Sequence, residues 1–272
     1  MNLMRLKGNL EQRNLDNRLS YEPDIIEFFL SDRDLLDPER IRDRIRQLHD
    51  RGVKAYLHHP PKHQGEYLDI LSDNPEVRRF YNESCELLAR ICIEEKAKCV
   101  VHAHYVGTHS CRDVTLERTL ILREEIRRIM AYSRDVFVWE DSIEGLFSYG
   151  GNPYLIDHLI VPLKLPLTVD VSHTFISFRG DNERLRDVLE RTKPYAQYYH
   201  LVDSMGLEHD SLQLGLGRID WRMVKPLVWG KDFIFEITLS GDHSDCTPMV
   251  ESAHYFANVE AEENGKSRQL LT

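Results

Sequence analysis

The chain lacks a long apolar run, and this absence excludes an integral membrane protein. No stretch approaches the roughly 18 consecutive apolar residues that a membrane-spanning helix needs. The first ten residues carry Arg5 and Lys7 and contain no apolar segment of the kind found in a secretory signal. We therefore expect a soluble, cytoplasmic protein that makes no contact with a membrane.

Cysteine is also scarce, and its spacing excludes two kinds of small structural site. The five cysteines are odd in number, and no two of them form a CxxC pair. A disulfide framework or a structural zinc ribbon needs paired or closely spaced cysteines. We therefore expect reduced thiols in the core and on the surface. These residues are Cys85, Cys92, Cys99, Cys111 and Cys246.

The composition that remains is typical of a folded protein with a full-sized core. Of 272 residues, 42% are hydrophobic and 29% are charged, which excludes a disordered chain. The 35 basic and 45 acidic residues give a formal charge of −10, which argues against a general nucleic-acid coat but still allows a locally basic groove. No linker rich in Gly, Ser or Pro interrupts the chain. We expect one domain over residues 1–272, with a polar tail at 262–272.

Short β-branched or aromatic runs recur along the sequence, each followed by a polar loop and an amphipathic helix pattern. Asp or Asn followed by Pro, as at 37–38 and 74–75, predicts the start of a helix, because proline lacks the N–H that would be unsatisfied there. Further helices are expected at 10–21, after Asp113, Asp181 and Asp220, and from Thr247. The predicted strands are Met4–Asn9, Asp24–Leu30, Lys54–His59, Lys98–Tyr105, Val136–Ser142, Leu167–His173, Tyr198–Asp203 and Asp232–Thr238.

Eight strands that alternate with helices over this length predict an α/β fold of the (β/α)8 TIM-barrel type, as a single domain. The competing architecture is a doubly wound open sheet. That sheet would favour fewer strands and a glycine-rich phosphate turn after the first of them. Neither GxGxxG nor GxxxxGK[ST] occurs in the sequence, so the barrel is the better prediction.

Polar side chains gather where the predicted strands end. In a TIM barrel the chemistry lies at the C-terminal ends of the strands, and seven of the eight predicted strands carry an ionisable group there. Buried carboxylates in apolar strands cost several kcal/mol unless they are paired or bind a metal. A mixed set of carboxylates and imidazoles suits zinc, manganese, cobalt or magnesium. The candidates are Glu27, His58, His59, His102, His104, Glu140, Asp170, His173, His200, Asp203 and Glu236.

The order of these motifs resembles the xylose-isomerase-like barrel superfamily. This superfamily contains metal-dependent sugar isomerases and epimerases and the endonuclease IV type of DNA-repair enzyme. The resemblance covers essentially the whole chain. It rests on HxP at His58, VVHAH at His102, WED at Glu140, TVDVSHTF at Asp170, HLVDS at His200, LGLGRIDW at Leu214–Trp221 and FEI at Glu236.

The resemblance to the sugar-acting members implies one divalent metal ion and a small sugar, sugar phosphate or polyol as substrate. Isomerisation or epimerisation would proceed by proton transfer through an enediolate, with Glu140 and Glu236 as the catalytic residues. A Lewis acid beside the oxygens lowers the barrier to such a step. The implied metal ligands are Glu140, Asp170, His200 and Glu236. His58, His102, His173 and Asp203 are expected to contact the substrate or to bind additional metal.

The alternative is a zinc-dependent phosphodiesterase of the endonuclease IV type that acts on abasic DNA and holds up to three zinc ions. That branch has an aspartate, one residue and then a histidine just before its LGxG turn, whereas this chain reads LEHDSL at 207–212. His209 and Asp210 are the candidates to complete such a cluster. A barrel that serves only in binding or assembly is a third hypothesis, and a homo-oligomer is compatible with all three.

Overall fold

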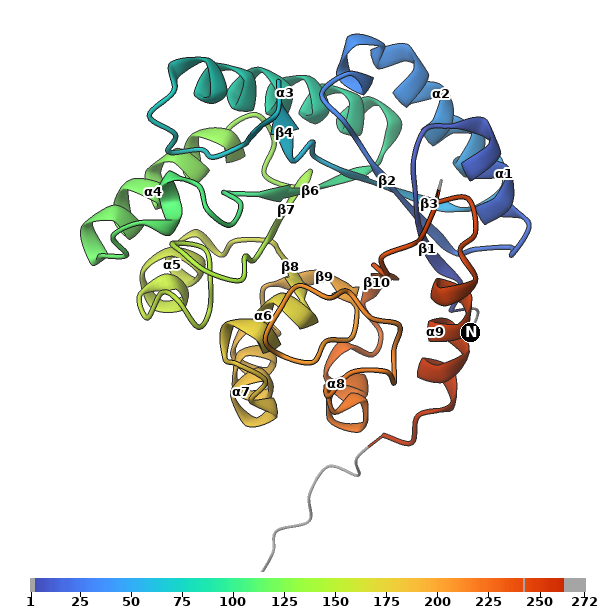
Figure 1. Ribbon diagram of the computed structural model, residues 1–272. Helices are drawn as coiled ribbons and strands as arrows, with labels where there is room; N and C mark the ends of the chain where they lie inside the picture. The colour runs from blue at the N-terminus through green and yellow to red at the C-terminus, as the bar shows by residue number, and fades with distance from the viewer. Residues whose placement is uncertain (1–2, 242, 262–272) are drawn as a thin grey trace, which may run out of the picture.

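The computed structural model describes residues 3–241 and 243–261. Eight parallel strands close into a barrel in the spatial order β1-β10-β9-β8-β7-β6-β3-β2, with helices around the outside (Figure 1). The predicted (β/α)8 fold is therefore confirmed. The barrel strands are β1 (Arg5–Gly8), β2 (Ile25–Phe29), β3 (Lys54–His58), β6 (Lys98–His102), β7 (Phe137–Glu140), β8 (Leu167–Asp170), β9 (Ala196–Leu201) and β10 (Asp232–Phe235).

Each barrel strand is followed by helical structure. A hairpin that the sequence pattern did not predict, β4 (Lys62–His63) and β5 (Glu66–Tyr67), lies between β3 and α3. The helices are α1 (Gln12–Leu19), α2 (Pro38–His49), α3 (Pro75–Glu95), α4 (Leu116–Met130), α5 (Val161–Leu163), α6 (Val171–Ser177), α7 (Asn182–Thr192), α8 (Trp221–Val228) and α9 (Thr247–Asn258). Further helical segments are η1 (Asp34–Leu36), η2 (His109–Cys111) and η3 (Leu155–Ile160). The predicted polar tail at 262–272 lies outside the described residues.

Most of the predicted helix starts are found where the capping residues place them. The Asp37 side chain accepts a hydrogen bond from the Arg40 N–H, and Asn74 accepts one from the Glu76 N–H. Two helices start later than predicted: α4 begins at Leu116 rather than just after Asp113, with Thr115 as its cap, and α1 begins at Gln12 rather than at residue 10. A capping side chain satisfies one of the N–H groups that the first turn leaves without a partner, which explains why these residues fix the helix starts.

The barrel interior consists of two layers that alternate along the strands with a period of two. The lower layer is an apolar cluster of six side chains, and the upper layer is polar. Since alternate residues of a strand point to the same face, each upper residue lies two positions after a lower one. The apolar layer therefore closes the floor beneath the polar one. It comprises Ile25, Tyr56, Val100, Val138, Tyr198 and Ile234, which precede Glu27, His58, His102, Glu140, His200 and Glu236.

Several strands end earlier than the sequence pattern predicts. The predicted strand Leu167–His173 stops at Asp170, and α6 begins at the next residue. The Asp170 carboxylate caps this helix by accepting a hydrogen bond of 2.8 Å from the His173 N–H. His173 thus lies on the first turn of α6 rather than on a strand. The capping bond takes over where the sheet pairing ends.

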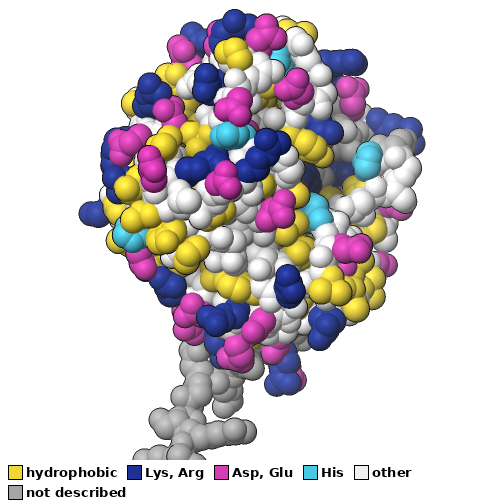
Figure 2. Space-filling model, turned by 60° about the vertical axis from the view of Figure 1, so that its left-hand side comes forward, with side chains coloured by type: hydrophobic (Ala, Val, Ile, Leu, Met, Phe, Trp, Pro, Cys, Tyr) yellow, Lys and Arg dark blue, Asp and Glu magenta, His cyan; other side chains and the backbone are white. Residues whose placement is uncertain are grey.

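The surface carries charges of both signs. In Figure 2, the side of the molecule that bears α4 shows Lys and Arg side chains interspersed with Asp and Glu. Over the residues drawn on that face, no broad basic surface of the kind that binds nucleic acid is formed. None of the described helices is long and apolar enough to cross a membrane.

Candidate metal centre

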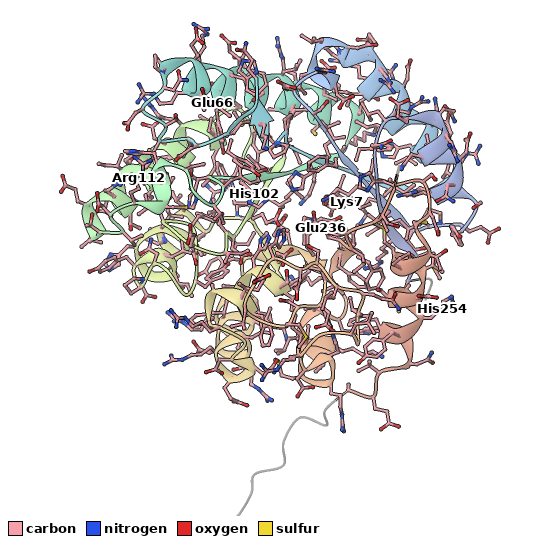
Figure 3. All side chains as sticks on the ribbon, viewed as in Figure 1. Lys7, Glu66, His102, Arg112, Glu236 and His254 are labelled. Carbon is pink, nitrogen blue, oxygen red and sulfur yellow. The ribbon has the colours of Figure 1, made fainter. Side chains whose placement is uncertain are left out.

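A cavity of about 880 Å³ opens at the C-terminal ends of the barrel strands. Lys7, His102 and Glu236 point toward its centre, whereas Glu66, Arg112 and His254 lie at the periphery of the molecule (Figure 3). Predicted site residues that line the cavity are His58, His102, Glu140, Asp170, His173 and Glu236, and His209 lines it as well.

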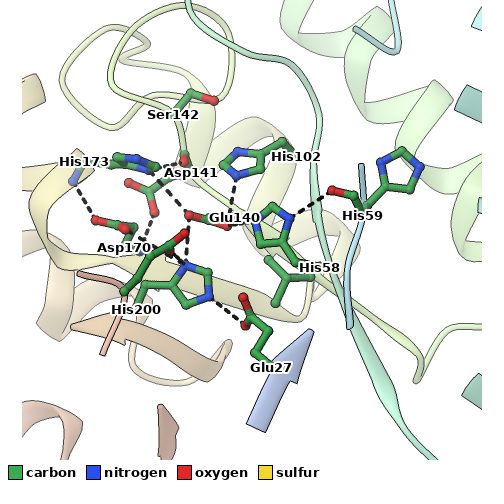
Figure 4. Close-up of polar contacts among 12 residues, drawn as sticks. Glu27, His58, His59, His102, Glu140, Asp141, Ser142, Asp170, His173 and His200 are labelled. Atoms are coloured by element: carbon green, nitrogen blue, oxygen red, sulfur yellow. Dashed lines mark hydrogen bonds and ion pairs between the residues drawn. The ribbon is translucent and has the colours of Figure 1, made fainter. Parts of the chain in front are cut away.

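Glu140 is the centre of the polar cluster and is 1% exposed. Its Oε2 lies 2.9 Å from His102 Nε2 and 3.2 Å from His58 Nε2. Its Oε1 lies 3.1 Å from His200 Nδ1 (Figure 4). Three histidines from three strands therefore converge on one carboxylate.

His200 is the second residue on which several side chains of the cluster converge, and it is fully buried. Its Nε2 lies 2.9 Å from Glu27 Oε2, and its Nδ1 contacts Glu236 as well as Glu140. The same nitrogen lies 4.0 Å from Asp170 Oδ2. Glu27 thus fixes the orientation of the His200 ring from the side opposite to the other carboxylates, which is the usual arrangement behind a metal-binding imidazole.

The electrostatics show a site rich in negative charge. Burial opposes ionisation of Glu140, but the charges of His102 and His200 outweigh it and hold the pKa of Glu140 well below its usual range. Burial lowers the pKa of His200, but Glu140 and Glu27 outweigh it and raise that pKa to about 10. The carboxylates therefore stabilise the protonated form of His200. A bound cation at this place would supply the same positive charge.

Two groups of side chains have the donor types and the spacing that a divalent ion needs. In each group one ligand atom per residue lies within 4.8 Å of all the others. Oxygen and imidazole donors fit zinc, manganese, cobalt or magnesium and do not select among them. The groups are Glu140 with Asp170, His200 and Glu236, and Glu140 with His58 and His102.

His173 and His209 form an incomplete third group. His173 Nε2 lies 3.2 Å from His209 Nε2, and His173 Nδ1 lies 2.9 Å from the Asp141 carbonyl oxygen. Among the described residues no further ligand joins this histidine pair. Asp210 instead accepts a hydrogen bond from the Met205 N–H through Oδ2, so it organises the loop after β9.

His58 and His59 point in opposite directions from the end of β3. His59 is 1% exposed and lies 2.7 Å from the Ser84 hydroxyl, which places its ring between the barrel and α3. Burial, together with the charges of His58 and His102, lowers the pKa of His59 to about 3. The strand alternation therefore puts only His58 into the cavity, as the sequence predicts.

We expect His58→Ala to reduce metal binding and turnover strongly, and His59→Ala to leave both nearly unchanged. The His59 variant instead loses packing and a buried hydrogen bond, which lowers the free energy of unfolding by about 2 kcal/mol. Urea unfolding and metal content of the two variants, measured side by side, check this. Equal effects of both substitutions on metal content would contradict the register of β3.

The structure places Asp203 outside the cavity, so the expectation that it contacts the substrate is not supported. It is fully buried beneath the loop after β9. Its Oδ1 accepts hydrogen bonds from the Ser204 and Ile219 N–H groups, and its Oδ2 accepts them from Gly215 and from the Trp221 indole. Asp203 therefore organises this loop.

Two site features were missed by the sequence reasoning. Lys7 on β1 reaches the cavity and forms an ion pair with Glu236. Burial lowers the pKa of Lys7, while Glu27, Glu140 and Asp170 act in the opposite direction. Asp141, the residue after Glu140, is fully buried, and burial raises the pKa of its carboxyl group well above the usual range. The two-residue period could have found Lys7, since it pairs in register with Glu27.

Comparison with solved structures agrees with this architecture. A D-tagatose 3-epimerase-like protein superposes with a TM-score of 0.71 at 16% identity, covering 93% of this chain and 96% of its own. The TTHB071 protein from Thermus thermophilus, soaked with ZnCl2, gives 0.71 at 18% identity and coverages of 97% and 99%. The 3-keto-D-glucoside 4-epimerase from E. coli gives 0.65 at 16% identity and coverages of 93% and 99%.

No curated protein sequence matches the chain. The family model for the xylose isomerase-like TIM barrel matches residues 20–237, which span the strands from β2 to β10. This match includes most of the polar residues around the cavity. The chain therefore belongs to the xylose isomerase-like TIM barrel family.

Proposed function

We propose that the protein is a divalent-metal-dependent isomerase or epimerase of a small sugar, sugar phosphate or polyol. The observation that carries this proposal is the four-residue ligand group of Glu140, Asp170, His200 and Glu236, which lies above the apolar floor at a cavity large enough for such a substrate. Structural neighbours named as sugar epimerases support the substrate class.

Three of the four candidate ligands are buried, and one remains accessible. Glu140 is nearly enclosed by imidazoles, and Asp170 uses one oxygen to cap α6. Glu236, at 21% side-chain exposure, faces the cavity and is the most accessible carboxylate of the group. A bound divalent ion would stabilise the negative charge that develops on substrate oxygens when a neighbouring C–H bond loses its proton. We therefore assign the proton transfer at carbon first to Glu236.

The test begins with metal content and proceeds to proton exchange. The purified protein, measured by elemental mass spectrometry, is expected to hold a divalent metal, and chelator treatment is expected to remove both metal and activity. Keto and aldo sugars, with their phosphates and the related polyols, are then incubated in D2O and followed by NMR. Deuterium entering at the carbon next to the carbonyl supports the proposal, and no exchange with any of them at full metal loading would contradict it.

Glu236→Gln is expected to abolish turnover and weaken metal binding while leaving the fold nearly intact. The amide keeps the size of the side chain but can neither accept a proton nor offer a charged oxygen to the ion. Circular dichroism checks the fold, and the D2O exchange assay checks the reaction. Turnover within a few-fold of the unsubstituted protein would reject the role of Glu236.

A metal-dependent phosphodiesterase is the second candidate function. The observation that favours it is the sharing of Glu140 between two ligand groups, because paired metal sites stabilise both the attacking and the leaving oxygen in phosphodiester cleavage. The incomplete pair of His173 and His209 argues against a full set of three ions. Two or more zinc ions per chain, with cleavage of an abasic oligonucleotide, would favour this candidate over the sugar enzyme.

A further inference from the structure

Lys7 is the one residue of β1 that enters the polar layer of the site. Its Nζ contacts Oε1 of Glu236 and lies 4.7 Å from the centre of the Phe29 ring. The Lys7 side chain is 19% exposed, so the ammonium group is largely shielded from water. Both side chains point to the centre of the barrel (Figure 3).

The two oxygens of Glu236 have different partners. Oε1 contacts Lys7, whereas Oε2 contacts Nδ1 of His200, another member of the ligand group. The carboxylate is therefore held by an ammonium group on one side and faces the candidate ion on the other. A cation bound by Oε2 would share the negative charge of Glu236 with Lys7.

We propose that Lys7 is a positioning residue that holds Glu236 by its Oε1 oxygen and sets the affinity of the site for its divalent cation. The inference rests on the proposed function, because it takes the four-residue group as the metal site. The ammonium group repels a divalent ion on the same carboxylate, and this repulsion is strong where water is largely excluded. Lys7 therefore keeps the ion exchangeable and keeps Glu236 oriented.

The sign of the effect separates this role from a merely structural one. If Lys7 only supported the fold around Glu236, its removal would loosen the ligand and weaken metal binding. If the charge of Lys7 opposes the ion, neutralising it strengthens metal binding, while the reaction suffers because Glu236 loses its partner.

The experiment compares zinc binding by the full chain and its variants after chelator treatment, by competition with a chromogenic chelator. Lys7→Gln and Lys7→Met are expected to bind zinc at least about tenfold more tightly. Lys7→Arg keeps the charge and is expected to stay within about threefold of the unsubstituted protein. Lys62→Gln is the matched control, since Lys62 lines the same cavity but lies over the Tyr67 ring and is expected to leave zinc affinity unchanged.

Turnover provides a second measurement. Lys7→Gln is expected to lower kcat more than it changes KM, and Lys7→Arg is expected to restore part of the loss. Circular dichroism establishes whether each variant folds. If only one of the two neutral variants, Lys7→Gln or Lys7→Met, folds, the comparison uses that variant. Unchanged or weaker zinc binding by the folded neutral variants overturns the role of Lys7.

The outcomes distinguish this inference from the proposed function. Tighter zinc binding by Lys7→Gln, with no exchange or turnover of any sugar, supports Lys7 as the counter-charge and contradicts the sugar enzyme. Sugar turnover by the unsubstituted protein, with zinc affinity unchanged in Lys7→Gln, supports the sugar enzyme and contradicts the role of Lys7. An unsubstituted protein that binds no divalent metal at all overturns both.

Discussion

A Glu140→Gln variant is expected to lose its tightly bound metal and at least about a thousandfold of its turnover. Glu140 belongs to both candidate ligand groups, and His58, His102 and His200 all converge on its two oxygens. The amide is the same size but carries no charge, and its NH2 group meets at least one of these imidazoles where an oxygen was. Metal content by elemental mass spectrometry and the D2O exchange assay measure the two losses.

Glu144→Gln is the matched control, because Glu144 lies in the loop that directly follows Glu140 and β7 but is exposed. It is expected to bind metal and turn over substrate as the unsubstituted protein does. Should Glu140→Gln keep its full complement of metal, Glu140 would not be a shared ligand. If only Glu140→Gln loses metal, the loss is due to the position of the Glu140 carboxylate inside the barrel.

The barrel and much of the candidate site could be predicted because both follow from one periodicity. Strand residues alternate between faces, and a (β/α)8 fold gathers the ends of its strands at one rim. A polar residue two positions after a buried apolar one, as in Val138 and Glu140 or Tyr198 and His200, therefore points into the barrel above the floor. The local sequence therefore encodes which residues point inward, and the closed barrel brings these residues together at one rim.

Other features follow only in part from local patterns. The two-residue period of β1 allows Lys7 to face the barrel interior, and the pairing of β1 with β10 and β2 brings it to Glu236. His173 lies on α6 because the Asp170 carboxylate, itself a candidate ligand, also caps that helix. In both cases the contact across the barrel, Lys7 with Glu236 and Asp170 with the other candidate ligands, becomes visible only in the closed barrel.

Asp203 illustrates the same limit, and its substitution tests a stability effect rather than a catalytic one. A carboxylate at the end of a barrel strand resembles a site residue in the sequence. In the structure, however, its two oxygens accept four hydrogen bonds, three from the loop that connects β9 to α8 and one from the indole of Trp221, the first residue of α8. The backbone of Asp203 also pairs with Leu212 across the same loop.

Asp203→Asn is expected to lower the free energy of unfolding by about 3 to 5 kcal/mol. Each oxygen of Asp203 accepts two N–H donors, so either orientation of the asparagine turns its NH2 group toward two donors and leaves them buried without an acceptor. Urea unfolding of the metal-free protein measures the loss. Asp220→Asn is the matched control, because Asp220 caps α8 at a less buried position of the same chain segment and is expected to cost about 1 kcal/mol or less. If Asp203→Asn unfolded like the control yet lost its turnover, Asp203 would act on the substrate after all, and its four donors would have found other acceptors.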